Sequence, residues 1–423
     1  MLNYFLEDSF RRNSAFYVTA VCLGDVIGFV FWIVAARFYN VADVGFATAL
    51  LAAINLIFML SRLGLDVGLV RFIHDEKDKS SLINTSLTVV GLASIVLSLI
   101  FIGGLNIWSV ALQPILGKFP VAALFVLLAF LCSLYWILNA TFLAFRRAHF
   151  SLIHVAILAL RIVLVIPLAF LGSVGILSAY AIAIGVATVV AFFLLTRIQH
   201  GYRPIPTIKK SAFDGAFRFN FGNYFADTFR MLPGLLLPVL IVNLISAETS
   251  AYFYMAWMAG ATVFGISAAV NNVFLAETVA NQDRIGVNIL KTTKLLVLLI
   301  GSLVVVTFFF GKWLLWLFGV NYADEGAELL SLLAVSAIPL TINEIFIALK
   351  KLEKNVMPIV FTRIFISAAT IVGGLLLTQA IGIKGIGIAL FVSQMLIAII
   401  VCPQLIRIVT HKHGKDKTQL EHK

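Results

Sequence analysis

Long apolar runs recur along the whole chain and are separated by short polar segments. Each run holds about 20 residues, which is long enough for a helix to cross a hydrocarbon core of about 30 Å. The runs do not alternate apolar and polar residues as the strands of a membrane barrel do. They predict twelve membrane-spanning helices, at 14–36, 44–61, 82–102, 121–145, 151–171, 174–195, 217–245, 251–276, 295–318, 327–349, 356–378 and 384–405.

Composition supports an all-α integral membrane protein. Hydrophobic residues make up 61% of the 423 residues and charged residues 12%, whereas soluble proteins hold about 45–50% and about 25%. The first run exceeds a signal-peptide core of about 7–15 residues and lacks a small-residue cleavage site, so we expect it to stay as a span. The three cysteines lie in apolar runs, and we expect them to pack as small apolar side chains.

The basic residues predict the orientation of the chain. About 24 of the 31 Lys and Arg lie in alternate connecting segments, which include both termini. Because cytoplasmic segments of membrane proteins are enriched in Lys and Arg, the pattern predicts that both termini lie in the cytoplasm. The net charge of +11 then reflects the basic residues of the segments predicted to lie in the cytoplasm. We expect a multi-pass protein of the cell membrane and no nucleic-acid partner.

The chain divides into two halves of similar organisation. Residues 1–200 and 217–405 would each form a lobe of six helices, joined by a cytoplasmic linker at 201–216 that contains RPIPTIKK. The basic tail, 406–423, is expected to lack fixed structure and to lie near anionic headgroups.

A weak internal repeat relates the two halves. Ala42 aligns with Ala247 at an offset of about 205 residues, and an acidic residue follows each of them. Both halves begin in the cytoplasm and hold six spans, so they would be parallel repeats with a substrate site between them. Three further matches lie at similar offsets: 146–153 with 352–359, Gly172 with Gly382, and Gly175 with Gly385.

A polar stripe interrupts the seventh span, where the sequence reads NYFADTFRMLP. Asn220, Asn223, Asp227 and Arg230 follow one another at steps of three, four and three, so a helix places them on one face. A charge at bilayer depth costs at least about 2.5–3.5 kcal/mol, which favours a face turned to the bundle interior or to water. Prolines bend helices, so we expect a hinge directly above this stripe, formed by Pro233 and Pro238.

Other spans also contain charges. Asp25 and Arg161 lie in the middle of the first and fifth spans, and Arg161 is too deep for its side chain to reach water. Arg363 lies nearer the cytoplasmic end of its span, where its side chain could extend to the surface. Alternatively, these charges are structural: Asp25 would bond to Arg161, and Asp227 would neutralise Arg230.

The remaining polar residues within spans are expected to be structural for the most part. Glu344 lies about one turn from the cytoplasmic end of the tenth span and would pair with Lys350 or Lys351. The asparagines of the spans, among them Asn343, would mainly form hydrogen bonds between helices.

Residues 34–73, VAARFYNVADVGFATALLAAINLIFMLSRLGLDVGLVRFI, resemble the lipid-linked oligosaccharide flippases of polysaccharide biosynthesis. These flippases belong to the multidrug/oligosaccharidyl-lipid/polysaccharide exporter superfamily. The resemblance implies two six-helix lobes in a fold like that of the multidrug exporters (MATE-like), around a V-shaped cavity that opens alternately inward and outward. It also implies a lipid-pyrophosphate-linked sugar repeat unit as cargo.

An anionic cargo needs cationic partners in a protected cavity. We therefore predict substrate contacts by Arg161, Arg230, Arg363, Asn223 and Asn271. Asp25 and Asp227 would tune these arginines or carry a coupling H+ or Na+.

No nucleophile–base set, metal motif or phosphate loop is recognisable, so neither catalysis nor a metal or other cofactor is expected. Membrane lipids, a polysaccharide polymerase or glycosyltransferases are the expected partners. A cation-coupled multidrug exporter of the same superfamily, which would depend on Asp25 or Asp227, and a membrane scaffold without transport activity are the alternatives.

Overall fold

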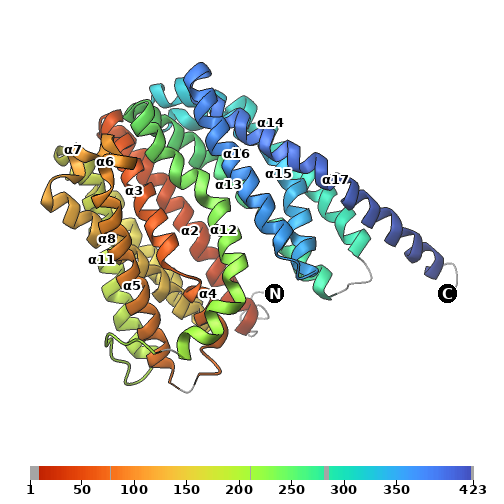
Figure 1. The fold of residues 1–423 in the computed structure, drawn as a ribbon, viewed down its shortest axis with the longest axis horizontal. Coiled ribbons are helices and arrows are strands. Elements are labelled where there is room, and N and C mark those ends of the chain that lie inside the picture. Colours follow the sequence, from red (N-terminus) through yellow and green to blue (C-terminus); the bar gives the residue numbers. More distant parts are fainter. Residues whose placement is uncertain (1–8, 77, 210, 281–284, 421–423) are drawn as a thin grey trace. The chain divides into compact units, whose positions relative to one another are not determined.

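A computed structural model describes residues 9–76, 78–209, 211–280 and 285–420 (Figure 1). The regular structure of these residues is entirely helical, as predicted. Eleven of the helices are long and apolar enough to cross a membrane, and a shorter apolar helical segment covers Ala148–Leu164. The chain forms two compact units. Unit 1 contains Met1–Tyr224 and Pro238–Ala251, and unit 2 contains Phe225–Leu237 and Tyr252–Lys423.

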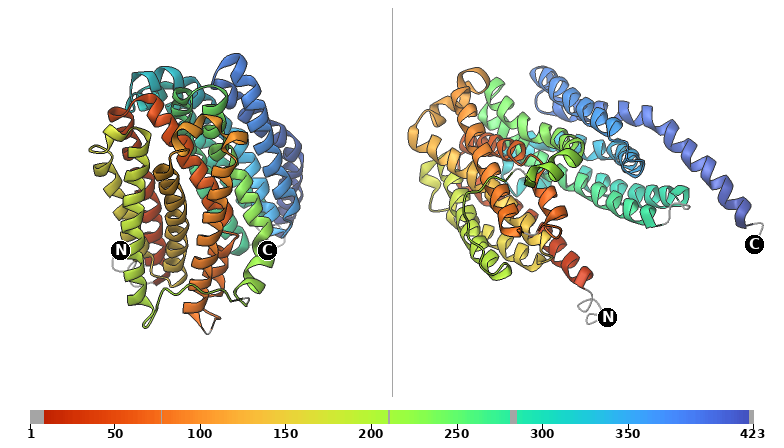
Figure 2. Two further views of the ribbon diagram at one scale, coloured as in Figure 1. Left: turned by 60° about the vertical axis from the view of Figure 1, so that its left-hand side comes forward. Right: turned by 60° about the horizontal axis from the view of Figure 1, so that its bottom comes forward.

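Unit 1 is a helical bundle in which α8 packs against both α5 and α11. Figure 2 shows the helices of this bundle running along one another from two further directions. Pro114 and Pro120 lie in the first turns of α7 and α8, where a missing N–H costs least. The elements are α2 (Ser9–Phe38), α3 (Val41–Ser61), α4 (Leu65–Phe72), α5 (Lys79–Gly103), α6 (Leu105–Trp108), η1 (Val110–Leu112), α7 (Gln113–Leu116), α8 (Phe119–Ala144), α9 (Ala148–Ala156), η2 (Ile157–Ala159), α10 (Leu160–Leu164), η3 (Ala169–Leu171) and α11 (Ser173–Ile198).

The fifth predicted span is not one continuous helix. A 3-10 turn, η2, separates α9 from α10, and turns follow at 165–168. Pro167 explains the end of α10, because proline disfavours helical geometry in the residue before it and cannot donate a backbone hydrogen bond. The prediction of a helix over 151–171 is therefore wrong in its second half, and Arg161 lies just after the 3-10 turn.

Unit 2 is built around α15, which packs against α14 and α17, while α16 packs against α17. Helices α12 and α13 contribute segments to both units: within α12, only Phe225–Leu237 belongs to unit 2, and α13 belongs to unit 2 from Tyr252 onward. Pro358 lies in the first turn of α16. The elements are α12 (Ser211–Leu244), α13 (Ala247–Ala280), α14 (Ile285–Trp316), α15 (Val320–Leu352), α16 (Met357–Ile381) and α17 (Lys384–Leu420).

Two turns between helices reproduce the internal repeat in the backbone. After α8, Arg146 has φ 54°, and its N–H and that of Arg147 donate to the carbonyls of Leu143 and Phe142. After α15, Lys354 has φ 55°, and its N–H and that of Asn355 donate to Lys351 and Lys350. Two non-glycine residues in the uncommon left-handed region, with the same hydrogen bonds around them, are a strong sign of duplication.

The matched glycines repeat this correspondence. Gly172 (φ 58°) and Gly382 (φ 74°) precede α11 and α17, and each accepts a hydrogen bond from the glycine three residues later. A Cβ atom at Gly175 would lie 2.1 Å from a backbone oxygen, and one at Gly385 would lie 2.6 Å from a backbone carbon. Both positions therefore exclude any larger residue. The structure supports the repeat that the sequence suggested only weakly.

The segment after α11 is bonded to α5 and to the residue that precedes it. Tyr202 donates its hydroxyl to Asn84 Oδ1 (2.7 Å), and Asn84 Nδ2 donates to the carbonyl of Arg203 (2.8 Å). The Lys209 ammonium contacts Asp78 at 2.8 Å. We call residues 201–209 the strap, because these bonds hold them to the N-terminal part of α5.

The basic tail continues helix α17 to Leu420, so the expectation that residues 406–420 lack regular structure is wrong. Extending an existing helix needs no new nucleation, which is the costly step of helix formation.

Candidate functional site

An ion pair joins the C-terminal half of α15 to the N-terminal half of α16. Arg363 Nη2 donates to Glu344 Oε1 at 2.7 Å, and the two side chains are only 9% and 13% exposed. The predicted pairing of Glu344 with Lys350 or Lys351 is therefore wrong, and Lys350 pairs with Glu353 at 2.7 Å. Arg363 does not extend to the surface either, because the buried carboxylate of α15 gives it a closer partner.

This ion pair lines a polar cavity of about 250 Å³ within unit 2. Five charged side chains, from α12, α15 and α16, and the amide of Asn271 on α13 supply its polar lining. The charged residues are Asp227, Arg230, Glu344, Lys351 and Arg363. Four residues that the sequence nominated separately, Asp227, Arg230, Asn271 and Arg363, thus lie around one space.

A smaller cavity of about 90 Å³ shares Arg230, Glu344 and Arg363 with the polar cavity. Its lining adds Trp257 and Pro233, so the polar groups border an aromatic wall. A Cβ atom at Gly234 would lie 2.6 Å from the indole nitrogen of Trp257, so the missing side chain of this glycine leaves room for the indole. The two cavities together place apolar and aromatic surface beside two arginines.

The polar cavity carries an excess of positive charge. Its three basic and two acidic side chains sum to +1. Asp227 Oδ1 lies 3.7 Å from Arg230 Nε, and these side chains are 61% and 44% exposed, so this pair is loose and open to solvent. Lys351 has no ion-pair partner among the residues that the structure describes. Arg230 and Lys351 are therefore available to an anionic ligand, whereas Arg363 is held in place by Glu344.

Asn271 has a free acceptor in this cavity. Its side chain is 5% exposed, and Nδ2 donates to the carbonyl of Ser267 at 2.9 Å. Its Oδ1 has no hydrogen-bond partner in the described part of the chain. Since buried polar atoms are nearly always satisfied, this oxygen suits a hydroxyl donor from a ligand or water.

Asn343 behaves differently from Asn271. Its Nδ2 donates to the carbonyl and to Oε1 of Gln394, at 2.9 and 2.7 Å, and so joins α15 to α17. The expectation that asparagines form hydrogen bonds between helices is confirmed here.

Arg161 lies in unit 1, buried between aromatic rings. Its Cζ lies 4.5 Å from the ring centre of Tyr180 and 5.2 Å from that of Phe31, and it is 7% exposed. The prediction that Arg161 cannot reach the surface is confirmed. Among the described residues it has no carboxylate partner, and its Nε has no acceptor. Cation–π contacts therefore contribute to its stabilisation, together with a hydrogen bond to the side chain of Tyr180.

Asp25 is exposed on α2 and forms no ion pair with the residues described. The Arg161 side chain reaches α2 one turn further along, at Gly28: a Cβ atom added there would lie 3.6 Å from Arg161 Nη2. The alternative in which Asp25 bonds directly to Arg161 is not observed.

The remaining predicted site residues lie on α12. Helix α12 continues through Pro233 and Pro238, so a bend at these residues stays a prediction. The side chain of Asn223 falls outside the described part of the structure.

Two features escaped the sequence analysis. Lys351 lies two turns after Glu344 on the same face of α15, and this spacing could have placed it in the cavity. In unit 1, Arg62 contacts Asp66 at 2.9 Å, and Trp136 Nε1 donates to the same carboxylate oxygen at 3.1 Å. This arrangement was not predicted, because the partner from α8 is remote in sequence.

Comparison with known proteins decides the family. The family model described as "Polysaccharide biosynthesis protein" matches residues 10–280, which is more than half of the chain. The chain belongs to this family. Among curated proteins, none matches the sequence.

Solved structures with this fold are transporters of the MOP superfamily. An inward-facing multidrug resistance MATE family transporter has a TM-score of 0.71 at 14% identity, with 92% of this chain and 96% of that chain covered. The lipid II flippase MurJ, in an inward closed conformation, has a TM-score of 0.69 at 13% identity, with coverages of 94% and 90%.

A third structure is a MOP superfamily transporter from Pyrococcus furiosus, described as having a binding pocket of reverse polarity. It has a TM-score of 0.56 at 14% identity, with 96% of each chain covered. This member of the polysaccharide biosynthesis family therefore has many apolar helices and the fold of these membrane transporters.

Proposed function

We propose that this protein moves a lipid-pyrophosphate-linked oligosaccharide from the cytoplasmic to the outer leaflet of the cell membrane, without chemical catalysis. The observation that carries the proposal is the net positive cavity of unit 2. A transporter of organic cations would need an excess of carboxylates in its binding cavity, whereas a pyrophosphate needs an excess of basic groups.

Different residues of the polar cavity would bind the two parts of such a headgroup, the pyrophosphate and the sugar. Arg230 and Lys351 would bind the pyrophosphate, because neither is closely paired. Arg363, oriented by Glu344, would present its remaining N–H groups as a fixed donor set. Asn271 Oδ1 would accept a hydrogen bond from a sugar hydroxyl. Arg161 in unit 1 stays a predicted contact, to be tested separately.

The test is reconstitution in liposomes with a fluorescent polyprenyl-pyrophosphate sugar. Arg230→Gln and Lys351→Gln should each reduce transbilayer movement roughly 10- to 100-fold, since hydrogen bonds to charged groups contribute about 1.5–3 kcal/mol. Lys312→Gln is the matched control, because Lys312 belongs to an exposed ion pair with Asp324 at the other end of α14 and α15. Folded wild-type protein that moves no lipid-linked sugar would refute the proposal.

One observation favours the multidrug exporter. Asp25 is an exposed carboxylate within a membrane span and has no ion-pair partner in the described structure. A cation-coupled exporter would use such a group for H+ or Na+, and loss of organic-cation efflux in Asp25→Asn would favour this function.

Binding to a polymerase or glycosyltransferase is a further proposal, which co-purification can test.

A further inference from the structure

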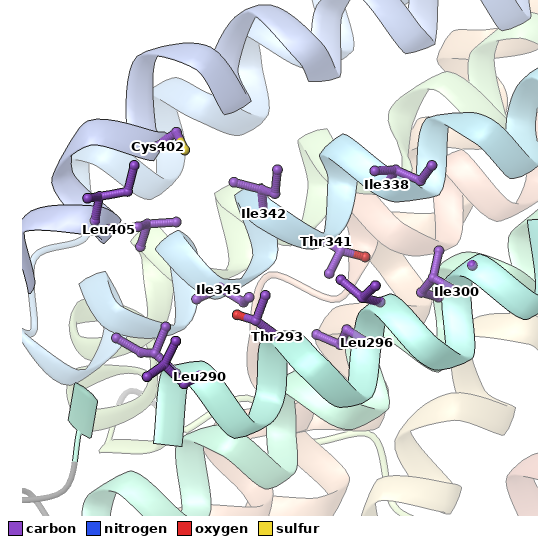
Figure 3. A pocket seen from close by; sticks show the side chains of 14 residues that line it. Leu290, Thr293, Leu296, Ile300, Ile338, Thr341, Ile342, Ile345, Cys402 and Leu405 are labelled. Carbon is purple, nitrogen blue, oxygen red and sulfur yellow. The ribbon is translucent and has the colours of Figure 1, made fainter. Parts of the chain in front are cut away.

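The largest described cavity of unit 2 is separate from the polar cavity. Helices α14, α15 and α17 enclose about 470 Å³ (Figure 3), a volume typical of ligand pockets. None of its 14 lining side chains is charged, and the only hydroxyl groups are those of Thr293 and Thr341. Because apolar cavities exclude water, this space suits a hydrocarbon occupant.

The cavity is a groove with a buried floor and an open rim. Leu296, Ile300 and Ile345 form part of the lining and are almost fully buried. Val297 and Ile406, which also line it, are 68% and 57% exposed. An occupant can therefore enter from the side of the helices while the floor holds it in place.

Helix α15 presents different faces to the groove and to the polar cavity. Ile338, Thr341 and Ile345 line the groove, whereas Glu344, Ile347 and Lys351 line the polar cavity. At about 100° per residue, these two sets point in clearly different directions. The groove and the polar cavity are therefore separate spaces on two sides of α15.

A basic residue stands at the rim of the groove. Lys294 follows Leu290 by four residues and precedes Val297 by three, so it shares a face of α14 with two residues that line the groove. Its side chain is exposed and has no ion-pair partner among the residues described. It lies near the end of α14 that the distribution of Lys and Arg places in the cytoplasm.

We propose that this groove binds one hydrocarbon chain of an anionic phospholipid of the cytoplasmic leaflet, with the lipid phosphate at Lys294. Basic pockets between transmembrane helices on the cytoplasmic side bind anionic headgroups in this way. The lipid would stabilise the contact of α14 with α15 and α17. This inference does not rest on the proposed cargo, because it requires no transport.

Native mass spectrometry of delipidated protein, titrated with phosphatidylglycerol or phosphatidylcholine, tests the site. We expect the wild type to retain one phosphatidylglycerol more tightly than phosphatidylcholine. Lys294→Gln should reduce this preference about fivefold, the effect of one basic residue near a membrane surface. Gly301→Phe should abolish the retention of both lipids, since a Cβ atom at Gly301 meets no atom within 4 Å and the ring would fill the groove.

Gly103→Phe is the matched control, because its Cβ also meets no atom within 4 Å but lies at the end of α5 in unit 1. Unchanged lipid retention in Gly301→Phe, or equal retention of the two lipids by the wild type, would overturn the proposal. Polyprenyl phosphate that binds more tightly than phosphatidylglycerol, and is lost in Arg230→Gln, would instead assign the groove to the cargo.

Discussion

Arg363 on α16 donates a 2.7 Å hydrogen bond to Glu344 on α15, and both side chains face the cavity that Arg230 also lines. The pair joins two helices and forms part of the candidate binding surface. It neutralises the buried carboxylate while it fixes the direction of the guanidinium.

Removing one member of this pair should destabilise the protein strongly. Arg363→Met leaves Glu344 buried without a partner, which costs roughly 3–5 kcal/mol for a buried ion pair. The double variant Arg363→Met, Glu344→Gln should recover much of this loss, because no charge is then left unpaired. Thermal unfolding of the purified variants checks this prediction, and additive losses in the double variant would contradict it.

Asn271→Leu should weaken the binding of the sugar part of the cargo. The substitution removes an acceptor without changing the charge of the cavity, and one hydrogen bond contributes about 0.5–1.5 kcal/mol. We therefore expect roughly a 2- to 12-fold loss of affinity for a lipid-linked sugar, measured by ligand titration. Polyprenyl pyrophosphate without sugar is the control, and its affinity should stay the same.

The aromatic contacts of Arg161 should contribute to the stability of unit 1. Tyr180→Leu removes the closer of its two ring contacts, and a desolvated cation–π contact contributes about 2 kcal/mol. Tyr180→Phe keeps the ring and removes only the hydroxyl that bonds to Arg161, so it should cost less than Tyr180→Leu. Chemical unfolding that gives equal losses for the two variants would show that the ring face does not stabilise Arg161.

The contact between Lys209 of the strap and Asp78, which precedes α5, should depend on pH. The hydrogen bond from Lys209 and that from the backbone N–H of Ser81 hold the pKa of Asp78 below its ordinary value. A lowered pKa in the folded state means that the contact stabilises fully above the unfolded pKa of about 3.9. The stabilisation is lost as the pH falls through the lower folded value.

Asp78→Asn should therefore increase hydrogen exchange of residues 201–209 at neutral pH, and acidification should add little further effect in this variant. The wild type should approach the variant only in strongly acidic solution. Lys312→Gln is a suitable control, because its ion pair lies in unit 2. Equal protection of the strap in Asp78→Asn and wild type would contradict the prediction.

The sequence determined the membrane setting, the helical class and most of the span positions. Apolar runs of fixed length leave a chain few options in a bilayer, because every buried backbone group must find a partner within its own helix. The repeat was also readable, since the turns at Arg146 and Lys354 and the glycines at Gly172 and Gly382 depend on local backbone geometry. The end of α10 before Pro167 was missed, although the local effect of a proline could have predicted it.

Only the tertiary structure decided which charges meet. The sequence placed Arg363 and Glu344 on separate helices. It predicted that Glu344 pairs with a lysine of its own helix and that Arg363 could extend to the surface, and both predictions were wrong. Their ion pair depends on how α15 and α16 pack, which local spacing does not contain. The same reason applies to Asn271 and Asn343. Both leave Oδ1 without a partner in the described structure, but only the neighbouring helices decide that Asn343 Nδ2 donates to Gln394 of α17 while Asn271 Nδ2 donates to Ser267 of its own helix.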